Sequence, residues 1–258
     1  MKGRGQIDTI VRTCQHVRFK EIIAPIGAEI DESALAAHSH RVLRLPTESL
    51  YYIFYHSKPL PSGDIVNPKD LNLSDADKLL LNEPDVRDSL FLGILPQPKL
   101  EMPSNPRFVL TIDGLVFPDN IGSLIRCASA VGGVDAILGT EGTCDFYGWK
   151  VLEASGGYGF NIPTKSGLSS GDVMRLAAEY ELLPIVGDST SGVDPCTLSL
   201  PPGKKGVMLI IGNEKHGAQK DLLDGAVRTR IRMGEKMDSL NAGVAGGMLL
   251  QIVRSIVR

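Results

Sequence analysis

The stretch MGEKMDSLNAGVAGGMLLQIV, residues 233–253, combines the spacing of a helix with residues that weaken one. Its apolar residues recur at helical intervals, yet Gly243, Gly246 and Gly247 lie among them. Each glycine costs about 0.8–1 kcal/mol relative to alanine in a helix interior. The apolar residues argue against a loose surface segment, so we expect something to approach this backbone very closely.

Composition places the chain among soluble globular proteins. Its 258 residues suit one large domain or two ordinary ones. Hydrophobic residues make up 43% and charged residues 22%, and no apolar run reaches the roughly 18–20 residues of a membrane span. The N-terminus lacks the apolar core of a secretory signal. We therefore expect a cytoplasmic protein, with an organellar location as the alternative because the first residues are mildly basic.

Charge and cysteine content exclude some classes of site. The net charge of −3 counts mildly against a nucleic-acid partner, because neutralising phosphates usually leaves a strongly basic footprint; a local basic patch is still compatible with it. The cysteines are scattered, without a C-x-x-C pair, which argues against a zinc site and favours free thiols in a reducing compartment. They are Cys14, Cys127, Cys144 and Cys196.

A proline-rich segment divides the chain. Residues 95–108 hold four prolines in a short polar stretch and are typical of a linker. We therefore expect a small α/β domain at 1–103 and a second domain at 104–258. In the first, the apolar pattern predicts strands in 19–26, 40–45 and 89–96, a helix or strand in 47–56, and a loop with one short helix in 57–88.

Strands and helices alternate more clearly in the second domain. The apolar runs 108–115, 136–140, 182–188 and 206–214 predict strands, and the segments 120–132, 148–155, 171–181 and the final residues predict helices. The third of these helices would open at Ser170 or Asp172. Nearly continuous apolar runs are typical of parallel strands that are buried on both faces. The sequence thus predicts an α/β fold with a parallel sheet.

Three polar clusters follow predicted strands, where parallel α/β sheets bind ligands. The first contains Asn120, expected to cap a helix, and Arg126 six residues later. A cap and a snorkelling arginine would explain this cluster without any function. In the second, Glu214 directly follows an apolar strand, and His216 is more readily explained as a solvated loop residue than as a base.

The third cluster, Ser239-Leu240-Asn241, precedes the final helix, and either polar residue can cap it. Motifs of other enzyme classes are absent from the sequence. It has no G-x-G-x-x-G, no Walker A sequence and no G-x-S-x-G. An ordinary nicotinamide or ATP site is therefore not expected.

Together the clusters resemble the three motifs of the SpoU-type branch of the SPOUT methyltransferases. DNIGSLIRCASAVG resembles the first motif, MLIIGNEKHG the second and IRMGEKMDSLNAGVA the third. KVLEASGGYGFNIP resembles the segment that links the first two. The resemblance covers about residues 108–258, and the order and spacing of the motifs make it specific.

The resemblance implies a C-terminal trefoil knot, S-adenosylmethionine as cofactor, no metal, and a homodimer with active sites near the interface. It implies methylation of a ribose 2′-hydroxyl in tRNA or rRNA, with the first domain binding the RNA substrate. Arg126 would position the ribose-phosphate and stabilise developing alkoxide charge. The other implied catalytic residues are Asn120, Glu214, Ser239 and Asn241, and the implied cofactor-binding residues are Ile211, Gly212, Ile231, Met233 and Leu240.

Three alternatives stay open. The first is a catalytically inactive, RNA-binding relative with the same fold. The second is a knotted enzyme that methylates a base nitrogen, which the Asn-to-Arg spacing and the Ser-Leu-Asn sequence disfavour. The third is an α/β enzyme acting on a small metabolite, which the acidic net charge suggests.

Overall fold

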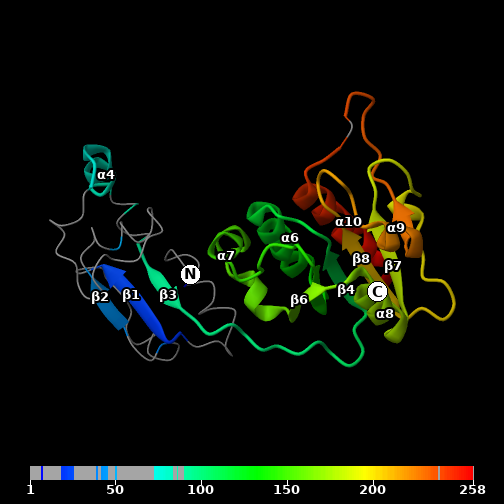
Figure 1. Ribbon diagram of the computed structural model, residues 1–258, viewed down its shortest axis with the longest axis horizontal. Coiled ribbons are helices and arrows are strands. Elements are labelled where there is room, and N and C mark those ends of the chain that lie inside the picture. Colours follow the sequence, from blue (N-terminus) through cyan, green and yellow to red (C-terminus); the bar gives the residue numbers. More distant parts are fainter. Residues whose placement is uncertain are drawn as a thin grey trace. The chain divides into compact units, whose positions relative to one another are not determined.

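The computed structural model describes residues 7, 19–25, 39, 42–45, 50, 73–83, 86, 90–237 and 239–257. The chain divides into two compact units, Met1–Pro98 and Lys99–Arg258 (Figure 1). Residues 95–107, which include the division, contain neither helix nor strand.

The first unit contains a small mixed sheet with the strand order β2-β1-β3. Strand β1 (Glu21–Pro25) pairs in parallel with β2 (Val42–Leu45) and antiparallel with β3 (Leu92–Ile94). Helix α4 (Asp75–Leu80) starts at a capping box in which Ser74 and Asp77 satisfy each other's backbone N–H groups. The three predicted strands and the short helix are confirmed, whereas all of 47–56 except Leu50 lies outside the described residues.

The second unit is built on a six-stranded sheet with the order β6-β5-β4-β8-β7-β9. Every strand pair in it is parallel, which confirms the predicted parallel α/β fold. The strands are β4 (Phe108–Ile112), β5 (Ala136–Thr140), β6 (Thr164–Leu168), β7 (Leu182–Gly187), β8 (Gly206–Ile211) and β9 (Val227–Thr229).

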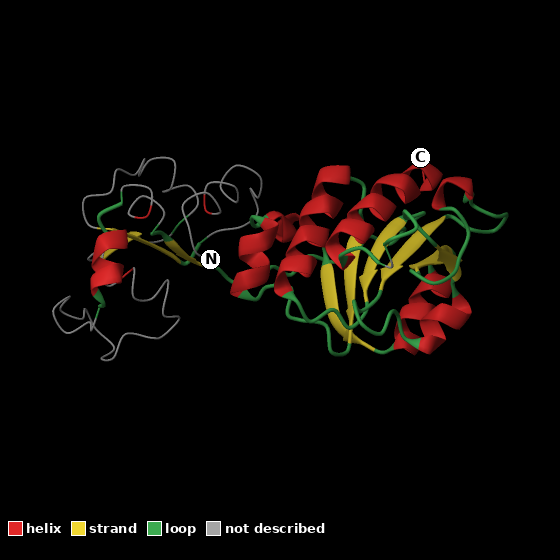
Figure 2. Ribbon diagram, turned by 90° about the horizontal axis from the view of Figure 1, so that it is seen from above, coloured by secondary structure: helices red, strands yellow, loops and turns green. Residues whose placement is uncertain are grey.

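Helices lie on both faces of this sheet (Figure 2). Apolar residues of α6 (Pro118–Val131), α7 (Trp149–Ser155) and α10 (Ala242–Val257) form one core with alternate residues of the strands. On the opposite face, α8 (Ser170–Glu179) and α9 (Lys220–Gly225) form a second core. Because both faces are covered, the central strands are buried along their whole length, as their apolar sequences require. Short 3₁₀ turns occur at Tyr158–Asn161 and Pro195–Thr197.

Three elements of the sheet unit escaped prediction. Strand β9 has three residues, too few to show a strand pattern. The polar sequence of β6 fits its place at the sheet edge, where most of its residues are exposed, so it carries no apolar run. Helix α9 has six residues, too few to show a helical period. Helix α8 begins at Ser170, one of the two predicted starts, and its N-cap is the preceding Ser169, which forms a capping box with Asp172.

Close helix packing explains the glycines of the final helix. A Cβ atom at Gly246 would clash with Leu124 of α6 and lie 3.3 Å from Ile211 of β8, and one at Gly247 would lie 3.0 Å from the sulfur of Cys127. Residues of the same chain therefore approach the backbone of the final helix closely, as its glycines led us to expect. Glycine lets α10 lie directly against α6 at the end of β8.

Substitution Gly246→Ala tests this packing. Leu124 is fully buried and has little room to move, so overpacking should cost about 1–3 kcal/mol. The better helix propensity of alanine returns only about 1 kcal/mol. We expect a net loss in the free energy of unfolding, measured by urea denaturation.

The matched control is Gly234→Ala, where an added Cβ would meet nothing within 4 Å. It should leave stability within about 0.5 kcal/mol of the parent. Equal stability of the two variants would contradict the packing argument.

Candidate functional site

The strand order brings together polar residues that are distant in sequence. Strands β4 and β8 are neighbours, so the segments that follow them meet at the same edge of the sheet. There the Asn120 Nδ2 atom donates a hydrogen bond to the Glu214 Oε1 atom, and the Asn241 Nδ2 atom donates to Asn120 Oδ1 over 2.8 Å. One residue from each predicted motif thus contributes to a single cluster, Asn120–Glu214–Asn241.

The predicted capping role of Asn120 is wrong. Helix α6 begins after Phe117 without a side-chain cap, and Asn120 lies in its first turn. Both polar atoms of its amide form hydrogen bonds within the cluster, and only 8% of the residue is exposed. Asn241, in contrast, does cap α10, because its Oδ1 atom accepts from the backbone N–H of Val244 at 3.2 Å.

The loop that carries Glu214 is held at both ends. At its start, the Asn213 amide donates to the Gly114 carbonyl over 2.8 Å and accepts from the backbone N–H of Lys215 over 2.9 Å. At its end, the buried Asp113 carboxylate accepts 2.6 Å hydrogen bonds from the backbone and side chain of Gln219. These bonds restrict the positions that the Glu214 carboxylate can take.

One oxygen of the Glu214 carboxylate has no partner among the described residues. The Oε2 atom is buried and accepts no hydrogen bond, although an unsatisfied buried acceptor is unfavourable by about 1–3 kcal/mol. Its other oxygen is held by Asn120. The free oxygen therefore offers an acceptor to a bound molecule.

Two of the predicted catalytic residues lie outside this cluster. Arg126, on α6, is exposed and forms no hydrogen bond or ion pair with a described residue. Ser239 is also exposed; in the described part of the chain its side chain has no partner and caps no helix. The structure therefore unites three of the five residues.

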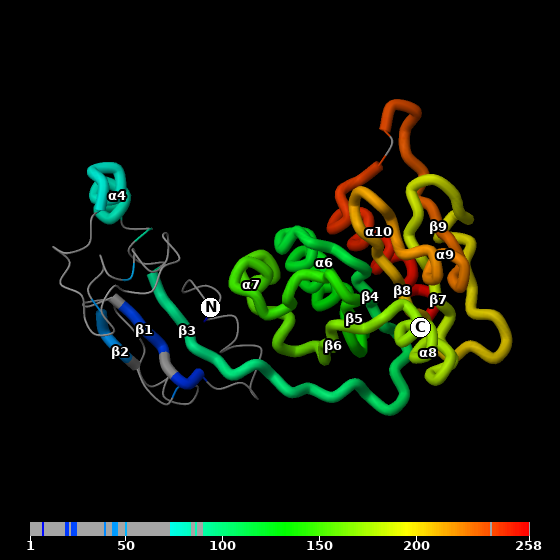
Figure 3. The backbone as a smooth tube through the Cα atoms, viewed as in Figure 1, coloured from blue at the N-terminus to red at the C-terminus, as the bar shows by residue number. Residues whose placement is uncertain are grey.

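A pocket of about 340 Å³ adjoins the cluster, within the roughly 300–1,000 Å³ of small-molecule sites. Glu214 and Ser239 line it, together with residues from the ends of β7 and β8 and from the loop between β9 and α10. Figure 3 traces the backbone of β7, β8, β9 and α10, the elements that these segments adjoin. All of the residues predicted to bind cofactor also line the pocket. They are Ile211, Gly212, Ile231, Met233 and Leu240.

The pocket also contains polar residues that sequence reasoning missed. Asp188 and Thr190 follow β7, and Arg228 lies in β9. Burial raises the pKa of Asp188, but hydrogen bonds from Thr190 and Ser191 outweigh it and hold the pKa below its ordinary value. A signal did exist, since Gly187-Asp188 follows an apolar strand just as Gly212-Asn213-Glu214 does. The sequence around Arg228 contains no comparable pattern of an apolar strand followed by a polar residue.

Neither a metal centre nor a membrane span is found in the described residues. No group of three or more histidine, cysteine, aspartate or glutamate side chains there could hold a metal ion. No helix in that part of the chain is long and apolar enough to cross a membrane.

Substitution Asn120→Asp tests the cluster. It would replace the amide donor with a second carboxylate beside Glu214, and two carboxylates in contact cannot both ionise readily. The shared proton raises a folded-state pKa above its unfolded value, so stability falls as the pH rises. We expect a loss of about 1–3 kcal/mol at pH 7 that shrinks towards pH 4, measured by urea denaturation across pH.

The double variant Asn120→Asp with Glu214→Gln is the control. It reverses the donor and acceptor of the same bond and should recover most of the stability at pH 7. A pH-independent loss in the single variant would show that the two side chains do not interact.

Comparison with known proteins gives relatives of one kind. The Bacillus subtilis 23S rRNA (guanosine(2553)-2′-O)-methyltransferase RlmP is 30% identical over 161 residues, which are 62% of this chain and 62% of that protein. The chain thus spans less than two thirds of that relative's length. The Neisseria meningitidis 23S rRNA (guanosine-2′-O-)-methyltransferase RlmB is 26% identical over 190 residues, 70% of this chain and 74% of that protein.

The fold also occurs in solved structures. The SpoU methyltransferase AviRb from Streptomyces viridochromogenes matches with a TM-score of 0.71 at 20% identity, covering 100% of this chain and 89% of that chain. A structure of AviRb in complex with the cofactor AdoMet gives a TM-score of 0.70.

A family model supplies the assignment. The model of the SpoU rRNA methylase family matches residues 107–251, a range that holds the Asn120–Glu214–Asn241 cluster and every pocket residue described above. Because this match covers more than half of the sequence, the chain belongs to the SpoU rRNA methylase family.

Proposed function

We propose that the protein is an S-adenosylmethionine-dependent methyltransferase acting on a ribose 2′-hydroxyl in tRNA or rRNA. The observation that carries the proposal is the Asn120–Glu214–Asn241 cluster, which presents a free carboxylate oxygen beside a ligand-sized pocket. The relatives named above as 23S rRNA 2′-O-methyltransferases support the same chemistry.

The pocket suits the proposed cofactor. Gly212 exposes backbone to it, while Ile211, Leu240 and Leu249 offer apolar surface for an adenine ring. The residues that would hold the cofactor are Ile211, Gly212, Ile231, Met233 and Leu240. Bound S-adenosylmethionine supplies a methyl group activated by a positively charged sulfur.

The chain's own residues would align and polarise the ribose. Holding the hydroxyl oxygen in line with the methyl group can supply several kcal/mol. The Glu214 Oε2 atom can accept a hydrogen bond from the ribose, with Asn120 and Asn241 holding the carboxylate in place. Ser239, whose side chain has no partner among the described residues, lines the pocket and would hydrogen-bond a bound molecule. The guanidinium group of Arg126 only donates hydrogen bonds, so it would position the ribose-phosphate and stabilise negative charge on the oxygen.

A homodimer would complete the site. Val244 and Met248 on α10 are 54% and 43% exposed, and Val116 and Phe117 just before α6 are 52% and 51% exposed. Val244 and Met248 adjoin the glycines of α10 that pack against α6, and exposed Arg126 is next in sequence to a residue of α6 that these glycines contact. We therefore propose that a second copy covers this face and brings RNA to Arg126.

We also propose that the chain end forms a trefoil knot. Support comes from the family and from α10, which packs back onto α6 and β8 after the chain has reached the edge strand β9. The domain at 1–103 would bind the RNA substrate, and the cytoplasm or an organelle would be the site of action. Both assignments rest on the resemblance of the sequence to the family.

Substitution Arg126→Ala tests the catalytic assignment. Loss of a donor to developing negative charge typically lowers the rate about 10²–10³-fold, while the fold and S-adenosylmethionine binding should persist. The assay is transfer of radiolabelled methyl groups to rRNA and tRNA, with calorimetry to measure cofactor binding. Asn120→Ala should lose activity less completely.

The control is Arg175→Ala on α8, an exposed arginine that pairs with its neighbour Asp172 and with no other described residue, and it should retain activity. Full activity of Arg126→Ala would remove the proposed role. Nucleoside digestion separates ribose from base methylation, turnover without RNA would indicate a small metabolite, and inactivity of the parent protein on both RNAs would favour a binding protein.

Substitution Met248→Asp tests the dimer. A charge buried between two copies is strongly unfavourable, so the variant should sediment as a monomer and lose methyl transfer. The comparison variant is Gln251→Asp, which introduces the same charge at an exposed polar position on the following turn of α10. A monomeric parent protein with full activity would contradict the proposed interface.

A further inference from the structure

A second polar group in the pocket, Asp188 with its neighbours, has no part in the proposed methyl transfer. Asp188 follows β7 and lies one strand away from Glu214 across the sheet. Its side chain is only 10% exposed, yet it contributes to the pocket wall. An ionised side chain in the wall of a ligand-sized pocket points to a ligand group that it recognises.

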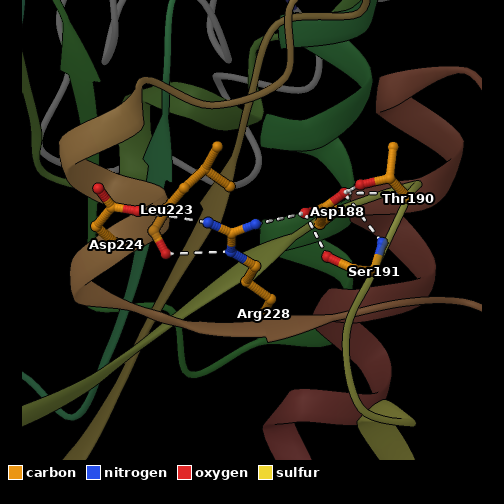
Figure 4. Close-up of polar contacts among 6 residues, drawn as sticks. All are labelled: Asp188, Thr190, Ser191, Leu223, Asp224 and Arg228. Atoms are coloured by element: carbon orange, nitrogen blue, oxygen red, sulfur yellow. Dashed lines mark hydrogen bonds and ion pairs between the residues drawn. The ribbon is translucent and has the colours of Figure 1, made fainter.

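The hydrogen bonds of Asp188 show what kind of group it accepts (Figure 4). Its Oδ1 atom accepts from the Thr190 hydroxyl over 2.7 Å, and its Oδ2 atom accepts from the Ser191 hydroxyl over 3.2 Å. Each carboxylate oxygen therefore holds one hydroxyl group. Thr190 and Ser191 are exposed, so their hydroxyl groups can hydrogen-bond to water instead of to Asp188. Two hydroxyl groups of a ligand can then donate to the two carboxylate oxygens in their place.

Arg228 holds the carboxylate from the other side. One guanidinium nitrogen lies 3.7 Å from Asp188 Oδ2, another lies 3.5 Å from Asp224, and Nε donates to the Leu223 carbonyl over 3.3 Å (Figure 4). Because this cation already faces Asp188, the negative charge of the carboxylate is balanced without an ammonium group from a ligand. The same contacts favour its ionised form, which is the stronger acceptor.

We propose that Asp188 accepts hydrogen bonds from the two ribose hydroxyls of the cofactor's nucleoside, one on each carboxylate oxygen, with Arg228 as a positioning residue. The inference rests on the proposed function, since it assigns a part of that cofactor. Acidic side chains at the ends of parallel strands bind ribose hydroxyls in other nucleotide sites by the same chemistry. Asp188 would thereby select a ribonucleoside over its deoxy form.

Calorimetry with three ligands tests the assignment. S-adenosylhomocysteine carries the whole nucleoside and amino-acid part, its 2′,3′-dideoxy analogue lacks both ribose hydroxyls, and methylthioadenosine lacks the amino-acid part. The variant is Asp188→Asn, whose amide oxygen can still accept the backbone N–H groups of Thr190 and Ser191 and so preserve the turn. Circular dichroism melting confirms that the variant is folded.

We expect Asp188→Asn to weaken S-adenosylhomocysteine and methylthioadenosine alike, each about tenfold, as for a lost hydrogen bond to a charged group. The 2′,3′-dideoxy analogue should bind the parent protein about a hundredfold more weakly than its ribose form, about tenfold for each lost hydrogen bond. In Asp188→Asn this second difference should fall to about tenfold, because the amide nitrogen replaces one of the two acceptor oxygens. Asp224→Asn, which touches Arg228 but lies outside the pocket wall, should bind all three ligands as the parent does.

Two results would overturn the inference alone. If the losses from Asp188→Asn and from the missing hydroxyls multiply, Asp188 does not contact the ribose. If the variant weakens S-adenosylhomocysteine but not methylthioadenosine, Asp188 serves the amino-acid part. Failure of the parent protein to bind S-adenosylhomocysteine at all would instead overturn the proposed function.

Discussion

The site depends on one side-chain amide, that of Asn120, which joins segments separated by about half of the sequence. It donates to Glu214 after β8 and accepts from Asn241 before α10. An amide can do both at once, whereas a carboxylate or an alkyl chain cannot. Because the free oxygen of Glu214 depends on this arrangement, the acceptor offered to a substrate is set by residues from all three motifs.

Close packing makes that geometry possible. Glycines in α10 let the helix lie against α6, which brings Asn241 within hydrogen-bonding distance of Asn120. The stability given up by glycine in a helix is offset by the core that α6, α10 and β8 share. Packing and polar contacts are therefore parts of one constraint, and a change in the spacing of the helices would separate the cluster.

The sequence predicted the central strands because buried parallel strands need unbroken apolar runs, and it predicted α6 because one side of that helix is apolar. It located the polar residues after the strands but misread Asn120 as a cap, since only the neighbouring position of β4 and β8 reveals its partners. Asp188 follows an apolar strand and could have been found, but its contact with Arg228 depends on the adjacency of β7 and β9, which no local pattern reveals. Ser169 was missed because several adjacent residues could cap α8.

The most direct measurement is a crystal structure of the protein with S-adenosylhomocysteine. The account predicts the nucleoside between Gly212, Ile231 and Leu240, with its sulfur turned towards the Glu214 carboxylate and the Asn120 amide. A ligand bound outside this pocket, or one whose sulfur faces away from the cluster, would contradict the central claim that these distant segments form one methyl-transfer site.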